Sequence, residues 1–89
     1  MKKELLPLSE KARSVKLGTY VHYKSSEMKY EVLGIARHSE TLEEMVVYKK
    51  LYGDHSEWVR PLEIFCGEVK VNGKIISRFT YVGDSYAAI

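Results

Sequence analysis

The 89-residue sequence has only one cysteine, Cys66, and no long apolar segment. A single cysteine excludes an internal disulfide, and its apolar context, IFCGEV, favours a buried side chain. No stretch approaches the roughly 20 apolar residues that span a bilayer, and the start, MKKELLP, lacks the apolar run of a signal peptide. We therefore expect a cytoplasmic protein with no membrane partner. A chain of this length forms one domain and has no room for a deep cofactor cleft.

A strong charge of either sign is also missing, since the net charge is +2. Residues 1–16 hold five basic and two acidic side chains, which leaves nine of the 14 basic and ten of the 12 acidic side chains in the rest of the chain. A domain that mainly grips phosphates is expected to carry a basic excess on its folded part. The composition therefore disfavours such a domain but leaves a local basic patch open.

Familiar catalytic and metal-binding motifs are absent. Ser39 follows His38, but adjacent residues on a strand project to opposite faces, and no Gly-x-Ser-x-Gly elbow presents a nucleophile. His22, His38 and His55 lack the spacing of a compact metal motif, and no cysteine cluster assists them. These patterns predict no catalytic residue, no metal ligand and no cofactor.

The sequence does contain a series of short segments that favour β-strands, because they are rich in β-branched and aromatic residues. The three longest are GTYVHYK (18–24), KYEVLGIARHS (29–39) and EMVVYKKLY (44–52). In the second segment, alternation places Val32 and Ala36 on one face. Leu33 and Ile35 then lie on the other face. Gly34, between them, favours a bend or bulge.

The second half of the chain continues this pattern. A short strand is expected around Trp58 and ends at Pro61, and PLEIF (61–65) favours one helical turn. Asn72-Gly73 favours a type I′ turn and predicts a hairpin in which Val71 pairs with Lys74 and Val69 with Ile76. About five short strands, one short helical turn and no long helix predict an all-β fold, a small barrel or roll.

The ends of the chain differ from this central part. We expect residues 1–16 to form an N-terminal arm or a short helix capped by Ser9, and residues 17–83 to form the β-barrel domain. Residues 84–89 carry no periodic signal and are expected to be a C-terminal tail.

The polar segment RHSET (37–41) supports three interpretations. Thr41 and Glu44 fit a capping box, in which both side chains satisfy backbone amides of a turn, and this structural interpretation is favoured. The second interpretation is ligand binding by these polar side chains. In the third, His38 and Glu40 share one face of a continuing strand and act as an acid–base or metal pair, with His22 as a further member.

Aromatic residues are numerous for so small a chain, with seven tyrosines, two phenylalanines and one tryptophan. For any one of them a core position is the favoured role. Tyrosine and tryptophan also line the grooves by which small barrels hold peptides or stacked bases. Arg37, Arg60 and Arg78 lie on or beside strands, where they can grip a carboxylate or phosphate, or pair with neighbouring glutamates.

Six segments also stand out by their order and spacing: GTYVHYK, YEVLGIARHSET, VVYKKLYGD, WVRPLEIF, V..NGK and RFTYV. Together they resemble the short bacterial proteins grouped as domain of unknown function 1653, over about residues 18–82. The resemblance implies an SH3-like β-roll, which agrees with the strand pattern. It implies no activity, because the family has none assigned.

The family's recurring HYKG and ARHSET segments resemble a shared surface, and here they fall on residues 22–24 and 36–41. This chain departs from the pattern after Lys24, where residues 25–29 form a longer loop in place of a glycine and a tight turn. A site built on the amide of that glycine would be affected. A site built on Trp58 and Arg60 would not, since WVRPLEIF is intact.

We therefore predict a small SH3-like barrel or roll that acts as a ligand- or partner-binding module. Its ligand stays open between a peptide, a small molecule and a nucleic acid. The alternatives are a small enzyme that uses His38 and Glu40 as an acid–base or metal pair, and a nucleic-acid-binding barrel. Aromatic side chains provide a flat apolar surface and polar ones provide directional contacts. The candidate ligand-binding residues are His22, Tyr23, Arg37, His38, Ser39, Glu40, Thr41, Tyr48, Trp58 and Arg60.

Overall fold

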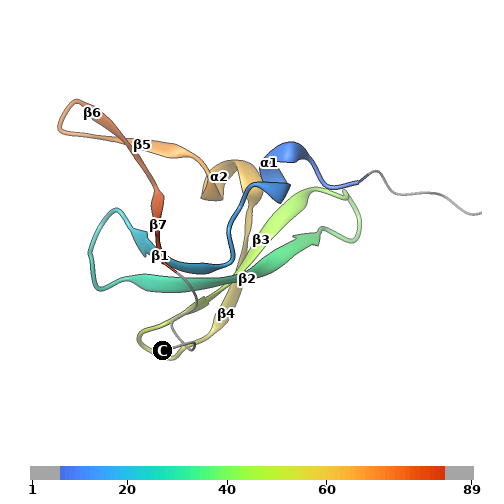
Figure 1. Cartoon of the computed structure of the whole chain (residues 1–89), viewed down its shortest axis with the longest axis horizontal. Helices are drawn as coiled ribbons and strands as arrows, with labels where there is room; N and C mark the ends of the chain where they lie inside the picture. The colour runs from blue at the N-terminus through green and yellow to red at the C-terminus, as the bar shows by residue number, and fades with distance from the viewer. Residues whose placement is uncertain (1–6, 84–89) are drawn as a thin grey trace, which may run out of the picture.

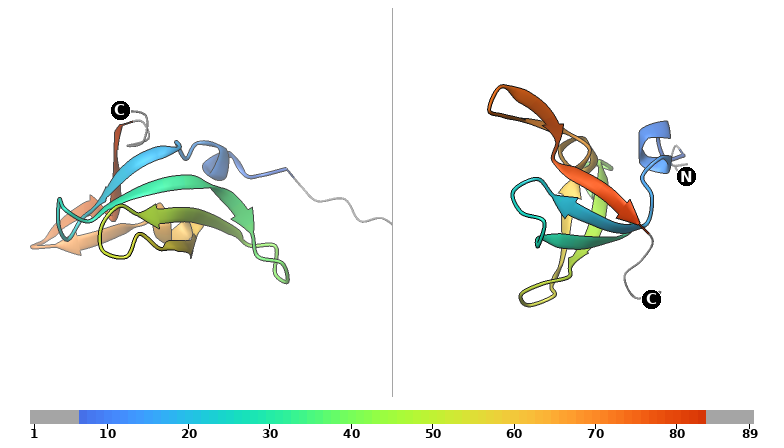
Figure 2. Two further views of the ribbon diagram at one scale, coloured as in Figure 1. Left: turned by 90° about the horizontal axis from the view of Figure 1, so that it is seen from below. Right: turned by 60° about the vertical axis from the view of Figure 1, so that its left-hand side comes forward.

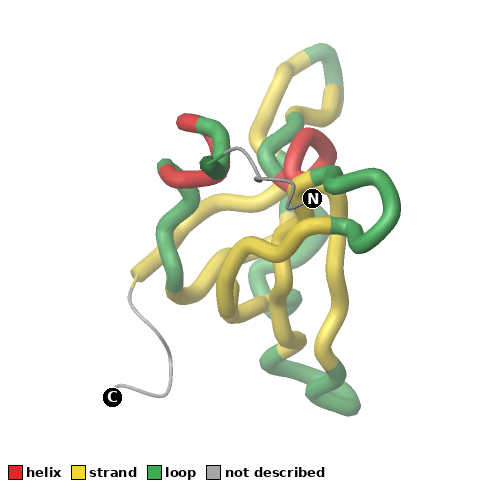
Figure 3. Tube along the Cα trace, turned by 90° about the vertical axis from the view of Figure 1, so that its right-hand side faces the viewer, coloured by secondary structure: helices red, strands yellow, loops and turns green. Residues whose placement is uncertain are grey.

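A computed structural model describes residues 7–83, so the expected tail at residues 84–89 lies outside the described residues (Figure 1). The strands are β1 (Gly18–His22), β2 (Lys29–Arg37), β3 (Glu44–Lys50), β4 (Glu57–Pro61), β5 (Glu68–Val71), β6 (Lys74–Ser77) and β7 (Phe79–Gly83). The helices are α1 (Glu10–Arg13) and α2 (Leu62–Phe65). Figure 3 shows how strands dominate the trace. In this part of the chain, no helix has the length and apolar character that a membrane span requires.

Five strands form one antiparallel sheet in the order β4-β3-β2-β1-β7, and β5 and β6 form a separate hairpin. Figure 2 shows the larger sheet curved like an arch, with α2 on its concave side. The edge strands β4 and β7 are not hydrogen-bonded to each other, so the described sheet is an open roll rather than a closed barrel. The predicted all-β fold class is confirmed, and its finer SH3-like assignment stays a prediction.

The core lies on the concave face and is largely aromatic. The rings of Phe65 and Phe79 are stacked with centroids 4.3 Å apart, and Tyr20, Tyr30 and Tyr48 pack around this pair. Edge-to-face and offset contacts of this kind add to the free energy gained by burying the rings. The buried apolar residues are Ala12, Tyr20, Tyr30, Val32, Val46, Tyr48, Leu62, Phe65 and Phe79.

A bulge in β2 changes which residues face this core. The register with β3 shifts between Val32 and Gly34, which confirms the irregularity expected at that glycine. Val32 is buried and Ile35 packs against the core, whereas Leu33 is 41% exposed and Ala36 is exposed. The prediction that Val32 shares a face with Ala36 was therefore wrong. Strict alternation assumes a continuous pleat, and the extra residue at the bulge reverses the phase.

The strands end earlier than the sequence indicated. β1 stops at His22 because the ring Nδ1 of that histidine accepts the amide of Lys24, at 3.2 Å, and turns the chain. β2 stops at Arg37, where His38 begins a similar turn. Composition does not reveal such side-chain acceptors, so predicted boundaries run on into the turns.

The hairpin agrees with its prediction in full. Val71 pairs with Lys74 and Val69 with Ile76. The φ angles of Asn72 and Gly73 are 51° and 79°, which is the left-handed conformation that a type I′ turn requires at both central positions.

The N-terminal helix α1 is joined to the roll by polar contacts. Ser9 caps it, as predicted, by accepting the amide of Ala12 at 3.1 Å. The amide and hydroxyl of Ser9 both donate to the Glu44 carboxylate at 2.7 Å, and these hydrogen bonds lower the pKa of Glu44. Lys11 forms an ion pair with Glu63 of α2 at 2.9 Å. The helix therefore contacts both β3 and α2.

The helical turn predicted over residues 61–65 is α2, which begins one residue later, after Pro61. Leu62 and Phe65, three positions apart, face the core and are buried. Cys66 caps the C-terminal end of this single turn and is exposed. The expectation of a buried Cys66 was wrong, because the helix ends there and the chain leaves the core toward β5.

Candidate functional site

The RHSET segment forms the turn between β2 and β3. The amide of His38 donates a hydrogen bond to the carbonyl of Glu43 at 2.8 Å. The carbonyl of His38 accepts one from the amide of Leu42, also at 2.8 Å. The Nδ1 of the same histidine accepts the amides of Glu40 and Thr41 at 3.1 and 3.3 Å. The hydroxyl of Thr41 accepts the amide of Glu43 at 3.2 Å. Each of these hydrogen bonds stabilises the turn itself.

The proposed capping box is only half correct. Thr41 does accept a backbone amide, but Glu44 accepts from Ser9 instead of from the turn. His22, the proposed third member of a metal set, is the last residue of β1 and lies near the first residue of β2, because its neighbour Val21 pairs with Lys29. His38 instead follows the last residue of β2, so the two histidines lie near opposite ends of that strand. Among residues 7–83, no group of three His, Cys, Asp or Glu side chains is placed to hold a metal ion.

Replacing His38 with alanine is expected to lower the free energy of unfolding by about 1 kcal/mol, because two turn amides lose their shared acceptor. His38→Asn, which keeps a side-chain acceptor, should recover part of this loss. Urea denaturation measures the effect, with Ser39→Ala as the matched control in the same exposed turn. Equal stability of His38→Ala and Ser39→Ala would contradict a structural role for the histidine ring.

Three other predicted residues come together on the concave face. Tyr48, Trp58 and Arg60 line one pocket of about 300 Å³. Pairing between β3 and β4 sets Tyr48 directly opposite Trp58, with Arg60 two residues along the same strand. We call this the aromatic pocket, and its six lining residues are Tyr30, Tyr48, Lys50, Tyr52, Trp58 and Arg60.

Sequence reasoning missed Tyr30, Lys50 and Tyr52. Lys50 is two residues from Tyr48 on β3 and lies opposite Tyr30 in the register with β2. Because side chains two apart on a strand share a face, placing Tyr48 in the pocket would have pointed to Lys50 as well. Predicting Tyr30 would have required the register between β2 and β3, which the sequence does not reveal.

Hydrogen bonds hold the floor of the aromatic pocket in place. The hydroxyls of Tyr30 and Tyr52 are 2.6 Å apart, and burial together with this hydrogen bond raises the pKa of Tyr30. Arg60 donates from Nε to the Tyr48 hydroxyl at 3.3 Å, and its guanidinium carbon lies 5.6 Å from the centre of the Phe79 ring. Pairing with a neighbouring glutamate was one of two interpretations of Arg60, and its side chain is instead positioned by aromatic partners.

The mouth of the aromatic pocket combines an exposed ring with a cation. Trp58 is 51% exposed and donates from its indole nitrogen to the Ser56 hydroxyl at 2.6 Å. The Lys50 ammonium lies 5.5 Å from the Tyr52 ring centre and 5.6 Å from that of Trp58. Lys50 and Arg60 are the charged lining residues, and none of the described residues that line the pocket is acidic.

His22 and Tyr23 lie beside the core rather than in the aromatic pocket. The rings of His22 and Tyr23 are 4.7 Å apart, and His22 also contacts Phe79 at 5.0 Å. His22 is only 8% exposed. Its burial, together with the charges of Arg60, Lys24 and Arg78, lowers the pKa of the imidazole.

The ten predicted residues therefore occupy three separate places. Three line the aromatic pocket, and two lie beside the core. Arg37, which pairs in register with Glu44, and residues 38–41 lie at the turn between β2 and β3. The structure does not bring the RHSET side chains together with Trp58 and Arg60 in one pocket.

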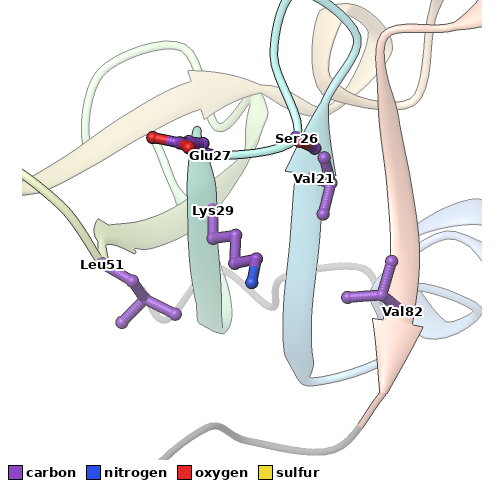
Figure 4. Close-up of a pocket in the computed structure, with 6 residues that line it drawn as sticks. All are labelled: Val21, Ser26, Glu27, Lys29, Leu51 and Val82. Carbon is purple, nitrogen blue, oxygen red and sulfur yellow. The ribbon is translucent and has the colours of Figure 1, made fainter.

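A second hollow, of about 650 Å³, lies on the opposite face of the sheet. Its lining residues are Val21, Ser26, Glu27, Lys29, Leu51 and Val82. In Figure 4 the Lys29 side chain extends between β1 and β2, and Val82 comes from β7. The hollow has aliphatic walls with one acidic and one basic residue, so it offers neither a stacking surface nor a charge of one sign. The aromatic pocket is the better candidate.

Comparison with known proteins identifies the family of this chain but assigns no activity to it. A crystal structure of a protein belonging to DUF1653 from Bordetella bronchiseptica is similar to this chain, with 36% sequence identity and a TM-score of 0.73. The similarity covers 82% of this chain and 94% of that one. Comparison with curated proteins gave no match. The model of the family described as "Protein of unknown function (DUF1653)" matches residues 18–81, and the chain therefore belongs to this family.

Proposed function

We propose that the protein is a binding module whose ligand occupies the aromatic pocket and combines a flat ring with a negative charge. The observation that carries this proposal is the position of Trp58, half exposed beside two cations on a concave surface. Ligand sites generally combine apolar walls with a few placed polar groups. A large exposed aromatic side chain in such a place is typical of a recognition surface.

The contacts in the aromatic pocket give each residue a role. The exposed indole of Trp58 provides a face on which a flat group can stack. Arg60 is held by Tyr48 and Phe79, so little of its conformational freedom would be lost on binding an anion. Lys50, which lies over two rings, supplies a second positive charge at the mouth. Recognition is therefore the activity that these groups suit best.

We also propose that this module is the predicted domain over residues 17–83 and that it acts in the cytoplasm. The single cysteine supports this location, because it forms no internal disulfide of the kind that oxidising compartments favour.

Trp58 is the only tryptophan in the chain, so its fluorescence reports directly on the proposed site. Titration with benzoate or benzenesulfonate is expected to change its emission in a saturable way. Benzamide, which lacks the charge, and cyclohexanecarboxylate, which lacks the flat ring, should each bind about fivefold or more weakly, because each loses one of the two contacts.

Arg60→Gln should weaken benzoate binding by about tenfold, since it removes a charge-assisted hydrogen bond. Lys70→Gln is the matched control, because it removes an exposed cation on β5, away from the aromatic pocket. Equal affinity of the wild type and Arg60→Gln for benzoate would refute the proposed site.

A further inference from the structure

Cations also gather behind the aromatic pocket. Arg60 lies over the Phe79 ring, and His22 contacts the same ring at 5.0 Å. Arg78 directly precedes Phe79, and its carbonyl accepts the amide of Tyr23 at 2.9 Å. The Nε of Arg78 is buried, and within the described part of the chain it has no hydrogen-bond partner. Lys24, Arg60 and Arg78 all act electrostatically on His22.

Three cations, Lys24, Arg60 and Arg78, therefore act on His22, and one of them, Arg60, also lines the aromatic pocket. The domain as a whole has no basic excess, so the concentration of positive charge here is local. Two cations, Lys50 and Arg60, line the aromatic pocket itself. One carboxylate carries a single charge, which one of these cations would satisfy. A phosphate ester carries up to two charges and several acceptor oxygens, and it can engage both.

The aromatic side of the pocket adds a second requirement. Trp58 is exposed enough to offer its ring face, and Lys50 lies within 5.6 Å of the ring centre. A base that stacks on the indole would therefore bring its attached phosphate near a cation. Stacking of a base on an aromatic side chain typically contributes about 1–3 kcal/mol per base. The pocket volume of about 300 Å³ suits a single base rather than a long folded segment.

We infer that the ligand of the aromatic pocket is a nucleotide, with its base stacked on Trp58 and its phosphate held by Arg60 and Lys50. This inference rests on the proposed function and names its ligand class. A free mononucleotide and a single-stranded nucleic acid share this chemistry, and the experiment separates them.

The test uses Trp58 fluorescence of the whole chain with four probes: AMP, adenosine, hexaadenylate and a blocked Asp-Phe-Asp peptide. AMP is expected to bind about tenfold more tightly than adenosine, because only AMP presents a phosphate to the two cations. Arg60→Gln should abolish this phosphate advantage, whereas Lys70→Gln should leave it unchanged. Thermal unfolding of each variant, monitored by circular dichroism, confirms that it is folded before binding is compared.

Hexaadenylate identifies the source of the nucleotide. If hexaadenylate binds more tightly than AMP and its affinity falls with salt, the ligand is a single strand. The slope of the logarithm of the binding constant against the logarithm of the salt concentration is then expected to be about −0.7 for each phosphate engaged. Affinity equal to that of AMP indicates a free nucleotide. Either result supports the inference.

Other outcomes overturn it. If AMP binds no better than adenosine, or less tightly than the peptide, while benzoate still binds, the nucleotide inference fails and the proposed function stands. If benzoate, AMP and the peptide all leave the fluorescence unchanged, both fail.

Discussion

Replacing Phe79 with alanine is expected to lower the free energy of unfolding by about 3–5 kcal/mol, the usual cost of removing a buried phenylalanine. Phe79 is 7% exposed, stacks on Phe65 and contacts the rings of Tyr30, Tyr48 and His22. A small domain has a total stability of only about 5–15 kcal/mol. The variant should therefore unfold at a much lower urea concentration, which circular dichroism measures.

Two controls separate the loss of this ring from a general effect of mutating β7. Phe79→Leu keeps most of the apolar volume and should cost about 1.5 kcal/mol or less. Thr80→Ala changes the exposed neighbour on the same strand and should stay within about 0.5 kcal/mol of the wild type. A cost below about 1 kcal/mol for Phe79→Ala would show that the aromatic cluster is not the core of the fold.

The second prediction with a large effect is a loss of stability at acidic pH that depends on His22. Burial and the nearby cations Arg60, Lys24 and Arg78 lower the pKa of this imidazole, so the unfolded chain binds its proton more readily than the folded one. The contribution of neutral His22 to stability is present above the unfolded pKa of about 6.5 and is lost as the pH falls toward the lower folded pKa. Stability should therefore decrease from about pH 7.5 to about pH 5.5.

The matched variant for this prediction is His22→Phe, which keeps an aromatic ring but cannot titrate. Its unfolding free energy should change less with pH than that of the wild type in this range. His22→Ala also removes ring contacts and is expected to cost about 2–3 kcal/mol at neutral pH. The lowered pKa values of Glu44 and Asp54 affect stability only at more acidic pH, near the ordinary carboxyl range. A parallel pH dependence in wild type and His22→Phe would assign the effect to other groups.

Much of the fold could be predicted because its signals are local. Asn72-Gly73 determines a turn type, and the turn determines the pairing of Val69 with Ile76. Composition predicted the four strands before α2, but their ends at His22 and Arg37 depend on side-chain acceptors that composition does not reveal. The prediction of which residues after Val32 face the core was wrong because of a bulge in β2. Gly34 indicates where such a bulge can form, but the shift in strand pairing depends on β3.

The candidate site was predictable only in part, because it depends on contacts between strands. Tyr48, Trp58 and Arg60 were chosen as aromatic and cationic residues, and the register between β3 and β4 does bring them together. His38 and Glu40 were chosen because they are polar and close in sequence, yet they form a turn. Polar residues that are adjacent along the chain often serve the local backbone, and a sequence alone does not separate this role from ligand binding.

The most direct test of the account is an amide chemical-shift titration of the isotope-labelled chain with benzoate and then with AMP. The account predicts that both probes shift the amides of the aromatic pocket residues, above all Tyr48, Lys50, Trp58 and Arg60, and that residues 38–43 stay unchanged. Shifts confined to residues 38–43, or to the hollow around Val21 and Val82, would contradict the claim that the aromatic pocket is the binding site.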